Sequence, residues 1–415
     1  MKSRVPVFIL IAVLCIAGNG HSQNSTSREA LLQQAQELIR AGRYTAAHAL
    51  LDSALRTTGP HPDVICDLVE NVLRHFVLQH DYRVFYLADS EAFRRYQSNE
   101  NNNHLRLVAF RYPDRWLKKV IRWNPQYGRA YKLLGDYYFL PYRDPAMPDP
   151  RIADIPPEIR EEIFQNYRKA VELQYSTPEV NLWLGKYYLV EDQRDVARQY
   201  FQQNVYGGAE DPFSYYYLAE ICFADKKYTQ TYNYALKALQ QYGQLGLDLR
   251  YEATRLAALA LYYLGEETQF LEYIRDCIRL FPDRQYAYLD LLNYYQAKGF
   301  LSDMEATMRE MLLNNPYDQE GYRFLETYSV QYKDFVFGEK LFEEMLVRFE
   351  HSDEALANIY RYRGNLLFHQ GFVQEARKYW EISRSYYRKF LPPDDPLLRE
   401  VGSMDAGSAQ SSNEQ

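Results

Sequence analysis

Residues 180–190 read Val-Asn-Leu-Trp-Leu-Gly-Lys-Tyr-Tyr-Leu-Val, and residues 196–201 read Val-Ala-Arg-Gln-Tyr-Phe, with a polar break at Glu191-Asp192-Gln193 between them. Both runs have the spacing of amphipathic helices, and both are too short to be stable alone. The stretch therefore predicts two short helices joined by a tight turn. Gly185 and Ala197 are small enough to let the helices approach, and Tyr188 and Phe201 fill the space beside them.

The same window recurs along the chain. Its small or packing position falls at steps of 34, 39, 34, 34 and 38 residues, at Gly185, Ala219, Ala258, Leu292, Glu326 and Gly364. Two further matches lie upstream, at Ala35 and Gly135. Pro282 and Pro316 each follow a packing position by 24 residues, so independent marks agree on one register. Glu326 stands where a small residue is expected, and we expect looser packing in that unit.

A sustained period near 34 residues with helix–turn–helix content resembles the tetratricopeptide repeat (TPR) family. The resemblance implies an all-α fold, an α-α superhelix (TPR solenoid) of about seven to nine helix pairs. It is a resemblance to a repeat family rather than to one protein. It therefore implies an architecture and a general type of function, but no specific partner.

The domain organisation follows from the register and from its interruptions. Residues 23–62 are expected to form the first TPR-like helix pair, and 63–126 an irregular helical region with possible degenerate repeats. Within it, Val64 to Val77 has a helical apolar stripe, and Tyr82 to Tyr96 is its expected partner helix. Residues 127–390 are expected to be a continuous array, and the small, polar end predicts that 391–415 is a disordered tail.

A proline-rich insertion interrupts the array at 141–157. Its six prolines prevent a helix from running through it, and the step from Gly135 to Gly185 is lengthened to 50 residues accordingly. One interpretation is a contact loop for a ligand. The favoured interpretation is a stiff elbow that lies on its own repeat.

Residues 1–22 have the features of an export signal. Lys2 and Arg4 precede an apolar run from Val5 to Ala17, and Gly20-His21-Ser22 gives a small-x-small cleavage site. The apolar run is short for a membrane span, so we expect no integral span in the mature chain. The alternatives are lipid attachment at Cys15 and an uncleaved anchor. The expected setting is a bacterial periplasm or cell envelope, with secretion as a further option.

Composition narrows the partners. The chain carries 48 basic and 55 acidic side chains, for a net charge of −7. This mild acidity argues against nucleic acid as the main partner. The 40 tyrosines suit helical repeats, because a Tyr ring can pack between helices while its hydroxyl stays at the wet edge. Cys66, Cys222 and Cys277 are expected to be buried thiols, although pairing of two of them stays open.

A search for catalytic motifs finds none. The sequence has no Gly-rich phosphate loop, no His-Glu-x-x-His pair, no Gly-x-Ser-x-Gly elbow and no Cys-x-x-Cys. We therefore expect no enzyme, no metal site and no cofactor.

The TPR resemblance implies a concave groove lined by the first helices of successive repeats. Transferring the family's groove positions to this register gives the candidate binding residues Phe213, Tyr216, Arg255, Tyr262, Tyr286, Asn293, Arg323, Arg361 and Asn365. The same rows include Glu220, Phe223, Leu259, Leu289, Gln296, Thr327 and Phe368. Rings supply contact area, and Arg and Asn can bond a peptide backbone. The alternative for each ring is packing against a neighbouring first helix.

The expected function is a non-enzymatic scaffold that binds a partner protein or peptide in this groove. The second hypothesis is a ligand-capturing protein that closes the 141–157 loop over a peptide or glycan. A loop packed on its own repeat would count against the second hypothesis. The oligomeric state is left open by the sequence.

Overall fold

The computed structural model describes residues 28–79, 84–87, 112–143, 151–209, 211–240 and 245–402. Contacts divide the chain into two compact units, Met1–Ser214 and Tyr215–Gln415, and the boundary falls within helix α10 (Pro212–Ala224). We describe the units separately. The predicted export signal at 1–22 lies outside the described residues.

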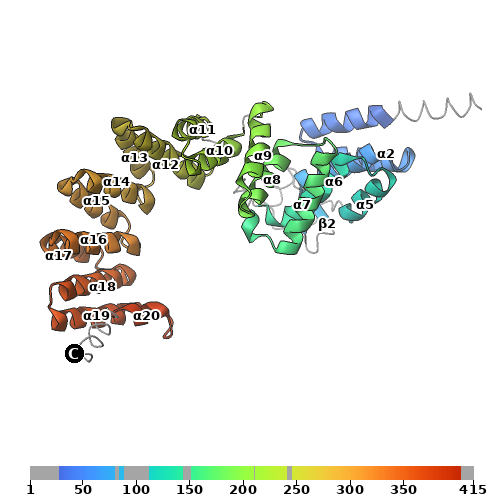
Figure 1. The fold of residues 1–415 in the computed structure, drawn as a ribbon. Helices are drawn as coiled ribbons and strands as arrows, with labels where there is room; N and C mark the ends of the chain where they lie inside the picture. The colour runs from blue at the N-terminus through green and yellow to red at the C-terminus, as the bar shows by residue number, and fades with distance from the viewer. Residues whose placement is uncertain are drawn as a thin grey trace, which may run out of the picture. The chain divides into compact units, whose positions relative to one another are not determined.

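Unit 1 consists of short helices packed as successive pairs (Figure 1). A helix over residues 28–40 is followed by α2 (Tyr44–Thr57), α3 (Pro62–His75), α5 (Pro113–Trp123), α6 (Gly128–Phe139), α7 (Pro157–Glu172), α8 (Pro178–Val190) and α9 (Arg194–Tyr206). The two helices predicted from the opening stretch are α8 and α9. Thr177 caps the first of them by accepting a hydrogen bond from the Val180 backbone N–H, at 3.4 Å.

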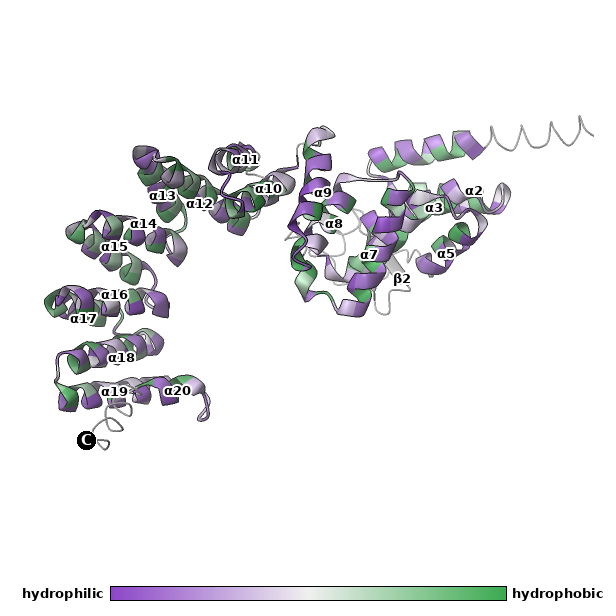
Figure 2. Cartoon of the chain, viewed as in Figure 1, coloured by the Kyte–Doolittle hydropathy of each residue, from purple (hydrophilic) through white to green (hydrophobic). Residues whose placement is uncertain are grey.

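Unit 2 repeats the same plan more regularly. It holds most of α10 and then α11 (Tyr228–Gln240), α12 (Leu247–Leu264), α13 (Glu267–Leu280), α14 (Gln285–Lys298), α15 (Leu301–Asn314), α16 (Gln319–Tyr332), α17 (Phe335–Arg348), α18 (Asp353–His369), α19 (Val373–Tyr387) and α20 (Pro396–Glu400). In Figure 2 the apolar residues of these helices gather on the sides that face neighbouring helices. Across the described residues nine helix pairs can be traced, within the predicted range.

Tight turns inside the pairs share one backbone conformation. Gly265, Gly299 and Gly371 all have positive φ, of 82°, 72° and 85°, which glycine adopts without steric cost. Lys226 and Lys333 adopt the same left-handed conformation, with φ of 60° and 57°. The turn is therefore set by the packing of the pair, and glycine only makes it easier.

The small position of the repeat lies against a ring from the second helix. A Cβ atom on Gly185 would come within 2.4 Å of the Phe201 ring, and one on Gly364 within 2.6 Å of Trp380. Gly135 is equally close to Tyr167, at 2.5 Å. These contacts leave no space for a side chain, because protein interiors are packed without gaps. The packing role predicted for Gly185 and Phe201 is confirmed.

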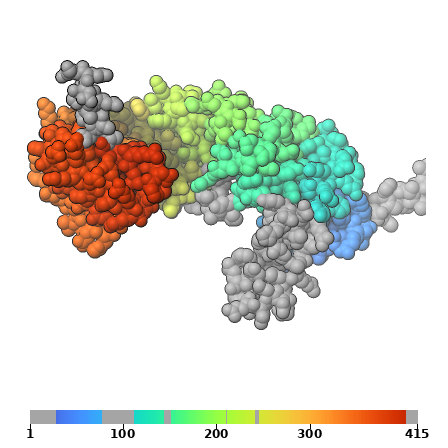
Figure 3. Space-filling view, turned by 90° about the horizontal axis from the view of Figure 1, so that it is seen from below, coloured from blue at the N-terminus to red at the C-terminus, as the bar shows by residue number. Residues whose placement is uncertain are grey.

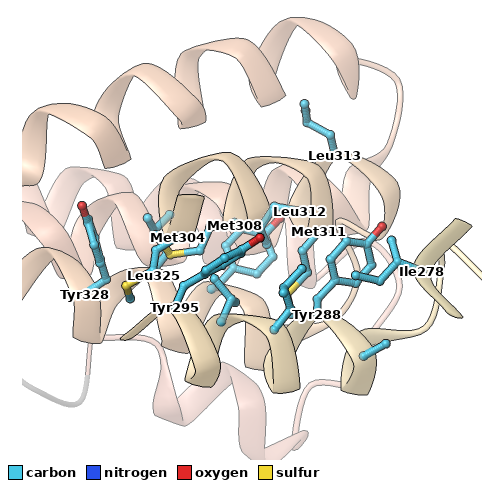
Figure 4. Packing of buried hydrophobic residues seen from close by; sticks show 14 of the residues in the cluster. Ile278, Tyr288, Tyr295, Met304, Met308, Met311, Leu312, Leu313, Leu325 and Tyr328 are labelled. Atoms are coloured by element: carbon cyan, nitrogen blue, oxygen red, sulfur yellow. The ribbon is translucent and has the colours of Figure 1, made fainter. Parts of the chain in front are cut away.

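A single apolar cluster runs through most of unit 2 (Figure 4). It extends in sequence from Tyr251 to Leu366 and includes fully buried Phe342 together with Met304, Met308 and Met311 from α15. Methionine is unbranched and adapts to irregular gaps between rings and Leu side chains. Each helix pair therefore buries its apolar face against the next, as expected for a solenoid.

Tyrosines join successive pairs through their hydroxyls. Tyr328 is 3% exposed, yet its hydroxyl donates to Glu305 on the preceding second helix, at 2.6 Å. Tyr294 donates to Glu267 at 3.1 Å. These contacts confirm that the rings pack between helices while the hydroxyls reach the polar edge.

The irregular region of unit 1 contains a β-hairpin. Strands β1 (Phe76–Gln79) and β2 (Val84–Leu87) pair antiparallel, with Phe76 opposite Leu87. The predicted helix over 82–96 is therefore wrong at 84–87, where a run of β-branched, aromatic and Leu residues favours a strand. Residues 88–111 lie outside the described residues. Helix α5 packs on α3, so the described part of 63–126 holds one helix pair with an insertion between its members.

The described ends of the proline-rich insertion pack on the helices beside them, the first end on α6 and the second on α8. Two short 3-10 helices, η1 (Leu140–Tyr142) and η2 (Ile152–Asp154), flank residues 144–150, which are not described. Ile152 and Ile155 are both 2% exposed and join the apolar cluster that contains Ile163 and Trp183. This supports the elbow interpretation over the contact loop.

The predicted disorder of 391–415 is wrong for its first part. Leu391, Leu397 and Leu398 cover the end of the α18–α19 pair, and Val401 is fully buried beside Trp380. The Val401 carbonyl accepts a hydrogen bond from the Arg384 guanidinium at 2.6 Å. We call residues 391–402 the C-terminal cap, whose apolar side chains pack closely enough to offset their ordering entropy. In Figure 3 the helices at this end form an unbroken surface.

The three cysteines of the described chain are buried thiols, as expected, and no disulfide joins Cys66, Cys222 and Cys277. Burial raises the pKa of both the Cys66 and the Cys277 thiols to about 12. Neither thiol is therefore ionised near neutral pH, and neither is an effective nucleophile.

Candidate binding surfaces

The exposed face of α14 and α16 carries the predicted groove residues that a partner could reach. Tyr286 is 50% exposed, and Asn293, Arg323 and Thr327 are exposed as well. They come from first helices of consecutive pairs. We call these four residues the unit 2 row.

The Arg255 side chain bonds to a neighbouring repeat. Its guanidinium forms an ion pair with Asp290 of α14, at 2.5 Å between Nε and Oδ2, and lies 5.3 Å from the centre of the Tyr286 ring. Burial alone would lower the pKa of Arg255, but the hydrogen bond and charge of Asp290 raise it. The side chain therefore stays charged and fastens α12 to α14. It also braces the exposed Tyr286 ring.

Tyr262 has a packing role. Its ring centroid lies 5.4 Å from that of Phe270 and 6.1 Å from that of Tyr294. These are ordinary distances for aromatic pairs in a core. The alternative of packing against neighbouring helices therefore holds for this ring.

Four predicted groove residues are buried. Phe213 is 8% exposed and Tyr216 is 7% exposed. Arg361 is 9% exposed, and its guanidinium donates to Gln319 at 3.1 Å and pairs with Glu400 of the C-terminal cap at 3.2 Å. The repeat pattern places Arg361 at the same register as Arg255, but it cannot show that a cap lies over it.

Asn365 is buried in a polar network with Glu326. Its amide donates to Glu326 at 3.0 Å and accepts from the Trp380 indole N–H at 3.0 Å. His369 also bonds Glu326, at 2.8 Å. The looser packing expected in the Glu326 unit is therefore not found. Glu326 accepts hydrogen bonds from the next first helix, while Phe342 of its own pair remains fully buried.

A polar pocket in unit 1 was not predicted from the sequence. Its volume is about 250 Å³, and we call it the α3 pocket because most of its residues come from that helix. It is lined by Gln36, Ile39, Asp67, Glu70, Asn71, Arg74, His75 and Arg129. The residues come from three first helices, those at 28–40, α3 and α6.

Charges in the α3 pocket are matched. Arg129 contacts both Asp67 and Glu70 at 2.6 Å, and Arg74 lies 3.0 Å from Glu70. Burial would raise the pKa of Glu70, but its bonds to Arg129 and Arg74 lower it. Burial, with the charge of Arg74, also lowers the pKa of His75, which favours the neutral ring near pH 7. Two cations thus face two anions.

Asn71 is the unusual residue of the α3 pocket. It is 2% exposed, and its amide nitrogen donates to the Tyr44 carbonyl at 3.1 Å. Its Oδ1 atom is buried and has no hydrogen-bond partner among the described residues. An unpaired acceptor of this kind costs free energy, and native proteins rarely retain one without a reason.

One sequence signal marks this position. Counting from the register, Asn71 occupies the place that Tyr187, Tyr294 and Tyr328 hold in other repeats. Those tyrosines contact the preceding second helix, as Asn71 does through Tyr44. Other repeats carry Ile221, Ala260 or Leu366 at this position, so Asn71 stands out by its amide, and this is visible only after α3 has been placed in register.

Among the described residues no group of three or more His, Cys, Asp and Glu side chains could hold a metal ion. Within the same ranges no helix is both long and apolar enough to cross a membrane. The groups that do cluster, in the α3 pocket and on the unit 2 row, are suited to non-covalent recognition.

Comparison with known proteins gives a likeness of fold. No family model matches the chain, and no curated protein matches it. Among solved structures it is similar to PilF of Pseudomonas aeruginosa, with 15% identity over 66% of this chain and 99% of that one and a TM-score of 0.41. It is also similar to YrrB, described as a TPR protein with an unusual peptide-binding site, with 13% identity, coverage of 57% and 95% and a TM-score of 0.37.

A third similar structure is TTC0263, a TPR protein of Thermus thermophilus, with 19% identity, coverage of 55% and 98% and a TM-score of 0.32. The succession of helix pairs in the structure itself makes this chain an α-helical repeat protein. The helix pairs, their register and their small-residue contacts confirm the expectation from the 34-residue period.

Proposed function

We propose that this chain is a non-enzymatic scaffold that binds an extended segment or a helix of a partner protein along the unit 2 row. The observation that supports it is the exposure of Tyr286, Asn293, Arg323 and Thr327 on consecutive first helices over a continuous, rigid core. A half-exposed ring beside amide and guanidinium groups offers contact area and hydrogen bonds at low entropic cost.

Rigid presentation favours this function. The Arg255–Asp290 pair and the Tyr328–Glu305 hydrogen bond fix neighbouring pairs to one another. A partner that binds across several pairs then has little scaffold motion to freeze, which preserves affinity. The row is thus a preorganised surface.

The ligand-capturing alternative needs the 141–157 insertion to close over a ligand. Ile152 and Ile155 are instead buried in an apolar cluster with Ile163 of α7 and Trp183 of α8. This counts against that alternative, as far as the described ends of the insertion go.

Export to a bacterial envelope is part of the proposal. It rests on Lys2, Arg4, the apolar run and the small-x-small site before Gln23. Expression with the leader intact, followed by N-terminal sequencing of the envelope fraction, should give Gln23 as the first residue. Retention of Met1 in that fraction would indicate an uncleaved anchor, and a lipid on Cys15 would indicate a lipoprotein.

The binding test compares two exposed surfaces of unit 2. The row variant carries Tyr286→Ser, Asn293→Ala and Thr327→Ala. Arg255 and Tyr216 are kept, because changing an interhelix ion pair or a buried ring would confuse binding with folding. We expect the row variant to lose the partners that the natural chain retains from an envelope extract, while circular dichroism shows that its helices are intact.

The matched control changes exposed residues of a second helix, α17, instead. Val336 and Val347 are 65% and 76% exposed on α17, and both are replaced by Ser. This control should retain the partners. Equal retention by the row variant and the natural chain would reject the unit 2 row as the binding surface.

A further inference from the structure

The α3 pocket combines two features that rarely occur together. It is open enough to have a volume of about 250 Å³, and it is lined by a side chain whose buried acceptor is unused. Among the described residues four other buried asparagines, Asn181, Asn204, Asn358 and Asn365, accept a hydrogen bond at the side-chain carbonyl. Asn358, for example, donates to the Pro316 carbonyl at 3.2 Å and accepts from the Tyr387 hydroxyl at 2.5 Å. The vacant Oδ1 of Asn71 is therefore not a general property of asparagines in this fold.

The unused atom determines what a ligand must supply. A carbonyl oxygen accepts hydrogen bonds, so the occupant needs an N–H or O–H donor. The pocket's four charges already neutralise one another, through Arg129 with Asp67 and Glu70, and through Arg74 with Glu70. A free cation or anion would have to disrupt those pairs, which is costly for partly buried charges. An uncharged ligand would leave them intact.

One uncharged group carries both a donor and an acceptor in a fixed plane, namely the amide. Its N–H suits Asn71 Oδ1, and its carbonyl suits a guanidinium, which only donates. Arg74 is 47% exposed in its side chain and lines the same pocket, so it is the guanidinium that a ligand meets. Ile39 supplies an apolar contact on the wall.

We propose that the α3 pocket binds an uncharged amide, with the ligand N–H donating to Asn71 Oδ1 and the ligand carbonyl accepting from Arg74. The site is separate from the unit 2 row, and it does not depend on the function proposed for that row. A peptide backbone and an Asn or Gln side chain both supply this chemistry. Asn71 Oδ1 is hidden from bulk water, so a ligand reaches it only when side chains that line the pocket move.

The experiment uses full-length protein recovered after expression with its own leader and labelled with ¹⁵N-asparagine. The first probe is N-acetyl-trialanine N-methylamide, in which every amide is a secondary amide of the backbone type. The second is propionamide, which carries the primary amide of an Asn or Gln side chain. Titration should shift the Asn71 side-chain resonance with one probe or both, and the tighter of the two identifies the source of the amide.

Two matched changes test the hydrogen bond itself. Replacing single N–H groups of the peptide by ester oxygens should weaken binding about tenfold at one position, because the donor to Asn71 is lost. Asn71→Leu should weaken binding by at least a similar factor. Asn166→Leu is the control, since Asn166 is a buried unit 1 residue whose amide bonds only the Glu162 carbonyl of its own helix among the described contacts.

The proposal is overturned if neither probe shifts the Asn71 resonance at tens of millimolar. It is also overturned if Asn71→Leu, folded by circular dichroism, binds the probes as well as the natural chain. In either case the pocket holds water only. These outcomes leave the unit 2 row untouched, since its test uses other residues and another readout.

Discussion

The two units join their helix pairs in different ways. In unit 2 the largest apolar cluster extends from Tyr251 to Leu366 across successive pairs, with smaller clusters around Ala219 and around Trp380, and polar contacts between pairs lie at its edge. In unit 1 the core is split into two clusters, one ending at Leu134 and one beginning at Ile152, and buried charges lie beside α3. The split coincides with the proline-rich insertion. Regular repeats therefore give a continuous core, and interrupted repeats leave gaps where polar groups, and a pocket, can be accommodated.

The largest expected effect tests the continuity of the unit 2 core. Phe342→Ala removes a fully buried ring and should lower the free energy of unfolding by about 4 kcal/mol. Because the cluster is continuous, hydrogen exchange measured by mass spectrometry should rise from α14 to α18. Faster exchange confined to α16 and α17 would show that the pairs are energetically independent.

The next effect tests the buried charges of unit 1. Arg129→Met removes the cation shared by Asp67 and Glu70 and should cost about 3 kcal/mol at pH 7. Burial raises the pKa of Asp67, so this acid destabilises the fold as pH rises and is relieved as it takes up a proton. The deficit measured by urea denaturation should therefore shrink from pH 7 to pH 5.

The matching change in unit 2 is Arg309→Met, which removes an exposed ion pair with Glu344. It should change the free energy of unfolding far less than Arg129→Met does, because exposed ion pairs contribute little. An equal loss of free energy of unfolding in Arg129→Met and Arg309→Met would show that burial does not distinguish the ion pairs of the two units.

A smaller effect tests the packing of a small residue on a ring, a type of contact that occurs within each unit. Gly185→Ala places a methyl group within 2.8 Å of three atoms of the Phe201 ring. Alanine favours the helix by about 1 kcal/mol, but overpacking costs about 1–3 kcal/mol, so we expect a net loss of about 1 kcal/mol. Adding Phe201→Leu should make the alanine neutral or favourable in thermal unfolding. If the stability losses of Gly185→Ala and Phe201→Leu were additive in the double variant, a steric clash would not explain the loss in Gly185→Ala.

The smallest effect concerns the tyrosine hydroxyls. Tyr328→Phe keeps the ring and removes the bond to Glu305, for a cost of about 1 kcal/mol. Tyr286→Phe is the control, since that ring is half exposed and should change thermal unfolding very little. A cost at both positions would mean that the hydroxyls act in some other way than by joining pairs.

The architecture was predictable because local and long-range signals agree in a repeat. The 34-residue step, the turn glycines and the small position at Gly185 all point to one register, and each helix pair contacts its neighbours in the chain. The hairpin at 76–87 was missed because an apolar run of that length suits a strand or a helix equally. The cap was missed because its few apolar side chains lie in a proline-rich stretch that carries no repeat pattern.

The binding surfaces were predictable only in part. Tyr286 and Asn293, which the register assigns to a groove, are exposed in the structure, and their part in binding stays a prediction. The register could not separate them from Arg361 and Asn365, because what covers a helix face is decided by another segment, here the cap. The α3 pocket depends on a single departure from the pattern, Asn71, and on partners from two other helices. A repeat period in the sequence shows neither the substitution at this position nor the partners from other helices.

The fit between small position and ring has a consequence for how such arrays can be rearranged. Gly364 meets Trp380 and Gly185 meets Phe201, whereas Leu292 has Met308 at the equivalent place. A crossover inside the turn of a pair would join a first helix carrying Leu to a second helix carrying Trp, and the two would collide. A crossover between pairs keeps each matched couple together. Genetic exchange, or the design of chimaeras, should therefore tolerate breakpoints near Pro282 and Pro316 and reject those at Gly265 and Gly299.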